Sequence, residues 1–129
     1  GNDLPTCNLA AIEEDHIETP FYYCVGGPIA VCSFPGGSSV DGLCDLHGNI
    51  EEWVADSYSE NYNASPVDGS VVSIDNMPGV VRGGHYNEES AFRLRNSYRK
   101  PKDPITTSPE IGFRCARYRE EIKNKVYLR

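Results

Sequence analysis

The sequence lacks two features that would place it at a membrane or on nucleic acid. No apolar run approaches the length of about 18 residues that a membrane-spanning helix needs. Basic residues are also in short supply, since 12 Lys and Arg face 19 Asp and Glu, for a net charge of −7. Because phosphate binding needs a basic surface, we expect no nucleic-acid partner. Because no apolar run is long enough, we also expect no membrane span.

Familiar catalytic motifs are missing as well. The chain has no nucleophile elbow, no phosphate-binding glycine loop and no H-E-x-x-H zinc helix. Its three histidines, His16, His47 and His85, are scattered. This spacing favours surface or packed residues over metal ligands. No chemistry therefore emerges from the residue pattern alone.

The five cysteines form no C-x-x-C pair. In a short acidic chain this usage indicates an oxidising, extracytoplasmic compartment: secreted, periplasmic or at the cell surface. We predict neighbour pairing, Cys7 with Cys24 and Cys32 with Cys44, although the sequence leaves competing pairings open. Cys115 is then the odd cysteine.

Twelve glycines and nine prolines favour short elements and long loops within a single domain, residues 1–129. Alternating, aromatic or branched residues predict the strands, and acidic residues predict one short helix. We expect strands over residues 21–25, 28–32, 49–55, 80–86, 92–99 and 111–117, a hairpin-like reversal at 26–27, a helical turn or two within 10–17, and loops over 57–79 and 100–109.

The segment 42–56 holds the only tryptophan and a dense group of carboxylates. Gly48 and two Asx residues predict a tight turn over residues 45–49. Its carbonyls, with the carboxylates of Asp45 and Glu52, would suit calcium, which takes about six to eight oxygen ligands. The alternative is that Asp45 caps a turn and Glu52 pairs with an arginine.

Three motifs in order resemble the formylglycine-generating enzyme (sulfatase-modifying factor) family. Residues 42–56 read GLCDLHGNIEEWVAD, similar to the family's G-L-Y-D-M-x-G-N-V-W-E-W-x-x-D, with Glu51 where a tryptophan is usual. Residues 80–86 read VVRGGHY and residues 111–117 read IGFRCAR, similar to its V-x-R-G-G-S-W/Y and L-G-F-R-x-A-R. The resemblance implies an α+β fold of formylglycine-generating-enzyme type, itself C-type-lectin-like, and identifies this chain with the C-terminal half of that domain.

The resemblance also implies ligands for calcium. The first motif of the family holds the ion through positions that match Asp45, Gly48, Ile50 and Glu52 of this sequence. A second calcium site starts at the match to Asn8 and Leu9, with Asp15 as a further ligand, although the spacing is shorter than usual. In parts of the family the match to Cys115 pairs with a cysteine upstream of this chain. Without that partner, Cys115 would be a buried free thiol or half of an intermolecular bridge.

The family's enzymes oxidise a substrate cysteine with copper and a cysteine pair, which would fall within residues 85–91. That interval contains no cysteine here. Our leading hypothesis is therefore a non-catalytic, calcium-stabilised binding or structural module of an exported protein. Its partner would be a protein, peptide or glycan, or the missing N-terminal half. We expect its groove to be lined by Tyr86, Glu88, Ser90 and Arg95. The alternative is a family enzyme with different catalytic residues, or one completed by that half.

Overall fold

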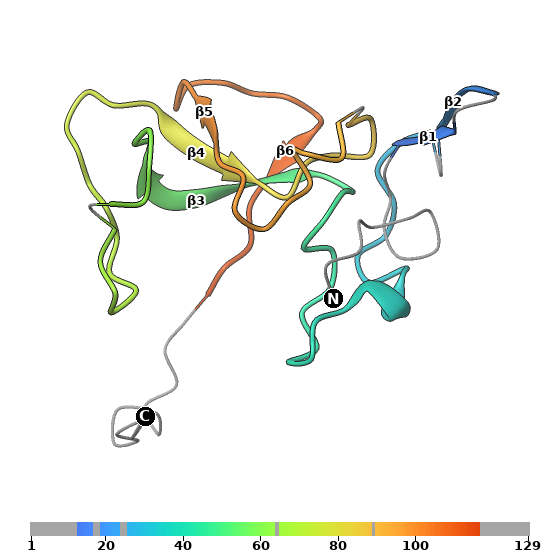
Figure 1. The fold of residues 1–129 in the computed structure, drawn as a ribbon, viewed down its shortest axis with the longest axis horizontal. Helices are drawn as coiled ribbons and strands as arrows, with labels where there is room; N and C mark the ends of the chain where they lie inside the picture. The colour runs from blue at the N-terminus through green and yellow to red at the C-terminus, as the bar shows by residue number, and fades with distance from the viewer. Residues whose placement is uncertain (1–12, 17–18, 24–25, 64, 89, 117–129) are drawn as a thin grey trace.

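A computed structural model describes residues 13–16, 19–23, 26–63, 65–88 and 90–116. Its elements are short and are joined by long loops (Figure 1). They are β1 (Glu13–His16), β2 (Thr19–Tyr23), the 3-10 turn η1 (Pro35–Gly37), β3 (Glu51–Ser57), β4 (Gly79–Arg82), β5 (Lys100–Lys102) and β6 (Ile111–Gly112).

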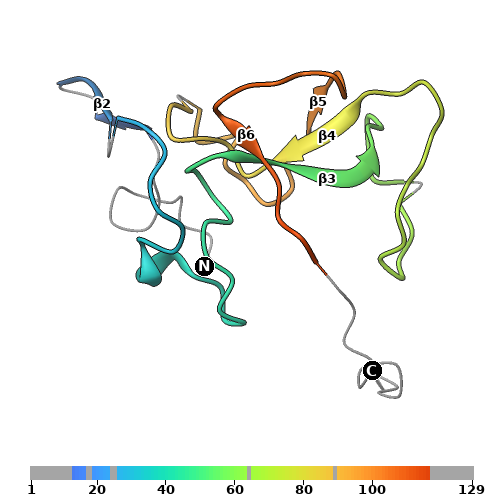
Figure 2. The same cartoon turned by 180° about the vertical axis from the view of Figure 1, so that it is seen from behind.

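A four-stranded mixed sheet forms the body of the molecule, in the order β5-β4-β3-β6. β3 runs antiparallel to β4, with Trp53 opposite Val81, and parallel to β6, with Glu52 opposite Gly112. A separate two-stranded sheet pairs β1 with β2 antiparallel. Viewed from either side, long loops connect the strands of the larger sheet, and β1 and β2 lie apart from it (Figures 1 and 2).

The described core is small. Val80 and Val81 are 0% exposed and Leu94 is 2% exposed. Neighbouring residues of a strand point to opposite faces, so two adjacent buried valines mean that β4 is covered on both sides. Leu94 comes from the loop after β4. The described core thus combines residues of β4 with one residue of the loop that follows it.

Three strands of the larger sheet, β3, β4 and β6, agree with the sequence prediction in place but not in length. β3 begins at Glu51 rather than at residue 49, because Asn49 has a φ of 61° and belongs to the turn. β4 ends at Arg82 rather than at residue 86, because Gly83 and Gly84 have φ values of 91° and 70°. Such left-handed conformations cannot continue a strand. β6 covers only the first two residues of the predicted strand 111–117.

Two predictions near the N-terminus are wrong. Residues 13–16, expected within a helix, form β1 and pair with β2, since a four-residue segment with three acidic residues and no apolar stripe has no helix face to bury. Residues 28–32 form no strand. The backbone N–H of Ile29 donates to the side chain of Asn49 at 3.0 Å, and Cys32 has a φ of 61°. The expected reversal between residues 21–25 and 28–32 is therefore replaced by the β1–β2 pair.

The predicted strand 92–99 is also wrong. Successive turns occupy this segment, in which the backbone N–H of Arg93 donates to the carbonyl of Ser90 and that of Leu94 donates to the carbonyl of Ala91. Leu94 is buried while Phe92 is 57% exposed, so the alternating residues do not share one face. Instead, β5 pairs with β4 from within the predicted loop 100–109.

The predicted fold class is confirmed by short strands, little helix, long loops and a mixed sheet. The loop predicted over residues 57–79 is present and connects β3 to β4, with Ser57 paired opposite Gly79. Within the described ranges, no helix has the length and apolar character needed to cross a membrane.

Candidate functional site

The turn before β3 is built from left-handed residues, as expected. Asp45, Gly48 and Asn49 have φ values of 52°, 74° and 61°. Asn49 is buried, and its side chain both accepts from Ile29 N at 3.0 Å and donates to Ile29 O at 3.2 Å. The N–H of Gly48 donates to the carbonyl of Gly83 at 2.9 Å. These contacts fix the turn between two neighbouring loops.

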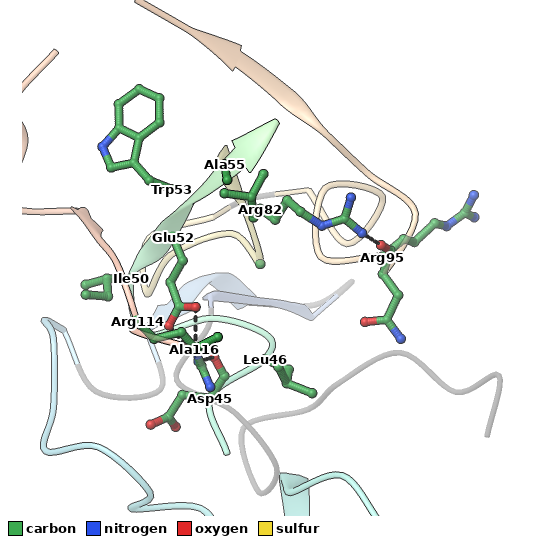
Figure 3. A pocket seen from close by; sticks show the side chains of 13 residues that line it. Asp45, Leu46, Ile50, Glu52, Trp53, Ala55, Arg82, Arg95, Arg114 and Ala116 are labelled. Atoms are coloured by element: carbon green, nitrogen blue, oxygen red, sulfur yellow. Dashed lines mark hydrogen bonds and ion pairs between the residues drawn. The ribbon is translucent and has the colours of Figure 1, made fainter. Parts of the chain in front are cut away.

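Glu52 forms a two-point ion pair with Arg114, which follows β6. Nε of Arg114 lies 2.5 Å from Oε2 of Glu52, and NH2 lies 2.6 Å from Oε1. The hydrogen bond with Glu52 raises the pKa of Arg114 above its ordinary value. Figure 3 shows the two side chains facing each other below β3, with Asp45 close by. Because β3 and β6 are parallel neighbours, the pair spans adjacent strands of the sheet.

The same guanidinium reaches the turn itself. NH1 of Arg114 donates to the carbonyl of Cys44 and NH2 donates to the carbonyl of Asp45, each at 3.0 Å. The carboxylate of Asp45 accepts from the backbone N–H of Cys32 at 2.7 Å. The arrangement is the one that the alternative interpretation expected, with Asp45 capping backbone and Glu52 paired with an arginine.

A calcium ion fits this conformation poorly, because Arg114 already binds both carboxylate oxygens of Glu52 and the carbonyls of Cys44 and Asp45. Asp45, Ile50 and Glu52 nevertheless line one cavity, so three of the four predicted ligands lie together. The calcium site stays a prediction. For the second site, Asn8 and Leu9 lie outside the described residues, and Asp15 lies in β1.

The cavity has a volume of about 740 Å³ and extends from the Glu52–Arg114 pair along β3. Trp53 belongs to its lining, with its indole pointing away from Glu52, and Arg82 and Arg95 lie at the far end (Figure 3). Arg82 is fixed there by hydrogen bonds to the carbonyl of Asn96 and, at 3.0 Å, to the hydroxyl of Tyr62. The arginines give an otherwise largely apolar cavity a positively charged end.

Of the predicted groove residues, Arg95 lines this cavity and the other three do not. Tyr86 and Ser90 are partly exposed outside it. Glu88 is 2% exposed and is therefore part of the interior rather than of a groove surface. The structure thus does not bring these four residues together around the cavity.

Cys32 and Cys44 form the predicted disulfide bond. Cys7 and Cys24 lie outside the described residues. Cys115 has no disulfide partner among the residues described, and it is exposed rather than buried. It follows Arg114 directly, where the chain leaves the sheet.

Sequence reasoning missed the role of Arg114 and of the buried acidic residue Glu51. Arg114 lies in the third motif, but the sequence does not identify Glu52 as its partner. Glu51 stands where the resemblance expects a tryptophan, and that departure was the available signal. Its carboxylate binds Nζ of Lys100 at 2.6 Å.

The sequence is similar to a known protein family. A family model described as the sulfatase-modifying factor enzyme 1-like domain matches residues 29–119. The chain is 35% identical over 78 residues to a formylglycine-generating enzyme of Streptomyces coelicolor, covering 58% of this chain and 25% of that protein. It is 26% identical over 92 residues to a formylglycine-generating enzyme of Mus musculus, covering 70% and 24%.

A third relative has a different name. The serine/threonine-protein kinase Pkn1 of Chlamydia trachomatis is 33% identical over 90 residues, which cover 67% of this chain and 14% of the kinase. The chain thus spans a quarter or less of the length of these curated relatives.

Among solved structures, Treponema denticola variable protein 1 aligns with a TM-score of 0.59 and 21% identity, over 82% of this chain and 34% of that one. At this identity the likeness supports the fold alone. The family model, in contrast, covers well over half of the sequence, and all three motifs lie within the matched residues. The resemblance inferred from those motifs is confirmed, and the chain belongs to the sulfatase-modifying factor enzyme 1-like family.

Proposed function

We propose that this chain serves as a non-catalytic binding or structural module of an exported protein. The observation that supports the proposal is the interval 85–91, where the family resemblance expects the reactive cysteine pair and this sequence has none. Buried His85 and Glu88 occupy the described part of the interval, and Arg93 holds Glu88 at 3.2 Å. Neither side chain offers the thiolate that a soft copper ion requires. The Cys32–Cys44 disulfide supports export to an oxidising compartment.

The cavity along β3 is the binding face in this proposal. An apolar lining with a few placed charges is typical of ligand sites. Ile50 and Val54 supply the apolar part here, and Arg82 and Arg95 supply the charges. The partner would be a protein, peptide or glycan, or the N-terminal half of the domain, and the arginines favour one with acidic groups.

A ligand screen can use a built-in reporter, because Trp53 is the only tryptophan and it lines the cavity. Titration with acidic peptides and sulfated oligosaccharides should change its fluorescence. Arg95→Ala should weaken the response at least tenfold, while Lys102→Met, outside the cavity, should preserve it. Equal affinity in both variants would remove the binding role from this cavity.

The non-catalytic part of the proposal is tested with a cysteine-containing peptide, copper and oxygen. We expect no aldehyde on the peptide by mass spectrometry and no copper-dependent oxygen consumption. Formation of formylglycine above the level in a protein-free control would contradict the proposal and support the enzymatic alternative. A positive control with a complete formylglycine-generating enzyme shows that the assay works.

The proposed calcium site comprises Asp45, Gly48, Ile50 and Glu52. Calcium binding there would require Arg114 to release Glu52, so the ion and the guanidinium compete for the same oxygens. The two carboxylates repel each other unless a cation lies between them. Either calcium or the guanidinium of Arg114 can supply that positive charge. Arg114 would therefore offset one of the two carboxylate charges at low calcium concentrations.

Melting experiments separate these two cations. A ligand present at about 100 times its dissociation constant stabilises the folded state by about 2.7 kcal/mol. We expect calcium to raise the melting temperature of wild type slightly and that of Arg114→Met by several degrees more, since that variant frees Glu52. Glu52→Gln should abolish the response, and Glu60→Gln, an exposed acidic control, should retain it. Absence of a calcium response in both wild type and Arg114→Met would end the calcium proposal.

A further inference from the structure

A second group of potential ligands lies on the sheet away from the Glu52–Arg114 pair. It consists of Glu51 from β3 and of His85 and Glu88 from the loop after β4, which are 2%, 9% and 2% exposed. One potential ligand atom from each lies within 4.8 Å of those from the other two. Because adjacent residues of a strand point to opposite faces, Glu51 projects away from the face that carries Glu52. The two groups are therefore separate.

Each of the two carboxylates has one oxygen engaged and one bare. Oε1 of Glu51 accepts from Nζ of Lys100 at 2.6 Å, and Oε1 of Glu88 accepts from NH1 of Arg93 at 3.2 Å. Within the described structure, Oε2 of Glu51 and Oε2 of Glu88 are buried without any hydrogen-bond partner. An unpaired buried carboxylate oxygen is costly, so two of them beside one imidazole point to a missing positively charged ligand.

The nearby side-chain nitrogens of Lys102 and His85 do not fill this role. Nζ of Lys102 lies 3.8 Å from Oε2 of Glu51, and Nε2 of His85 lies 3.9 Å from Oε2 of Glu88. Both distances exceed those of a hydrogen bond. The space between the bare oxygens and the imidazole is thus bounded by charged groups that do not satisfy them.

We propose that Glu51, His85 and Glu88 bind a divalent cation of the zinc type. Zinc takes imidazole nitrogen and carboxylate oxygen at about 2.0 to 2.2 Å, commonly in a tetrahedral arrangement. Calcium and magnesium prefer all-oxygen sets with several waters, which a buried site with one imidazole does not supply. Oε2 of Glu110 lies 3.9 Å from Nε2 of His85 and offers a fourth ligand.

The outer contacts orient the ligands. Lys100 and Arg93 hold the far oxygens of the two carboxylates, as second-shell partners do in metal sites. Tetrahedral ligands at these bond lengths are about 3.4 Å apart, so the 3.9 Å between Nε2 of His85 and Oε2 of Glu88 must shorten slightly. The other ligand atoms, which lie within 4.8 Å of one another, must also move closer when the ion binds.

Two features limit the affinity. The backbone N–H of Asn87 donates to Nδ1 of His85 at 3.2 Å. A neutral imidazole that binds metal through Nε2 carries its proton on Nδ1, so this hydrogen bond must be given up. Lys100, Lys102 and Arg93 also repel an incoming cation. The ion would connect β3 to the loop after β4, and its binding should therefore raise the melting temperature.

Isothermal titration with zinc alone tests the proposal, with cobalt absorption as a spectroscopic check on nitrogen and oxygen ligands. The protein carries Cys115→Ser, because the exposed thiol of Cys115 is itself a zinc ligand. We expect one zinc ion per chain. Glu88→Gln and His85→Gln should each weaken binding at least tenfold, while Glu60→Gln, an exposed acidic control, should leave it unchanged.

Circular dichroism establishes that each variant is folded. If Glu88→Gln folds poorly, His85→Gln gives the same comparison, because it leaves both carboxylates with their basic partners. Failure of the Cys115→Ser protein to bind zinc overturns the proposal. Binding that survives both Glu88→Gln and His85→Gln also overturns it. The calcium and peptide-oxidation experiments are separate measurements. The outcome of the zinc titration therefore does not depend on the proposed function.

Discussion

Gly84 shows how one residue sets the loop that follows β4. It has a φ of 70°, and a Cβ built on it would lie 2.6 Å from Cδ2 of Leu94. Leu94 is one of three buried hydrophobic residues of the described core. The absence of a side chain at Gly84 thus allows both the left-handed backbone and the close approach of Leu94.

Gly84→Ala should consequently be much more damaging than Gly69→Ala. Both glycines have positive φ, but nothing lies within 4 Å of a Cβ at Gly69. Backbone strain is common to the two variants, whereas overpacking adds about 1 to 3 kcal/mol only at Gly84. Urea denaturation of the two proteins measures this difference. Equal losses of stability would mean that Leu94 is free to move aside.

At the scale of elements, the sheet is joined across β4 by charges. Glu51 on β3 binds Lys100 on β5 at 2.6 Å, and β4 lies between these strands in the sheet order. Lys102, also on β5, is more distant from Glu51, at 3.8 Å. Two lysines of one short strand thus offer a matched comparison.

Removing one partner of a buried ion pair costs about 3 to 5 kcal/mol, because the other charge is left uncompensated. Lys100 is partly exposed, so we expect Lys100→Met to cost about 2 to 3 kcal/mol after solvent screening is taken into account. Lys102→Met should cost under about 1 kcal/mol, as typical of a pair without a hydrogen bond. Chemical denaturation in a chelating buffer measures both values without interference from metal. A larger loss for Lys102→Met would reverse the assignment of the pair.

At the scale of the whole molecule, covalent links add to a small core. Cys32 and Cys44 are bonded across a separation of 12 residues. The bond closes the loop that carries η1 and ends beside the turn at Asp45. It therefore restrains the segment that leads into the candidate site.

Non-reducing peptide mapping should find Cys32 linked to Cys44 and, as still predicted, Cys7 linked to Cys24. Maleimide should label Cys115 in the native protein, since that residue is exposed. Replacing Cys32 and Cys44 together by serine should lower stability by about 3 kcal/mol on the chain-entropy account. A Cys44–Cys115 peptide in the map would contradict this scheme.

The sequence by itself determined the family, three of the four strands of the larger sheet in outline (β3, β4 and β6) and the turn at residues 45–49. These depend on local properties, namely motif order, period-two alternation and the left-handed preference of Gly48 and Asn49. The same local signals were misleading for residues 28–32 and 92–99. There the backbone bonds went to the side chain of Asn49 and to turns around buried Leu94.

Only the tertiary structure decided which charges meet. Arg114 lies 62 positions from Glu52 along the chain, and Lys100 lies 49 positions from Glu51. No spacing rule connects such distant residues, because their proximity depends on β6 and β5 adding to opposite sides of the β3–β4 pair. His85 read as an isolated residue in the sequence for the same reason. Its neighbours Glu51 and Glu110 reach it through strand pairing and the path of the loops.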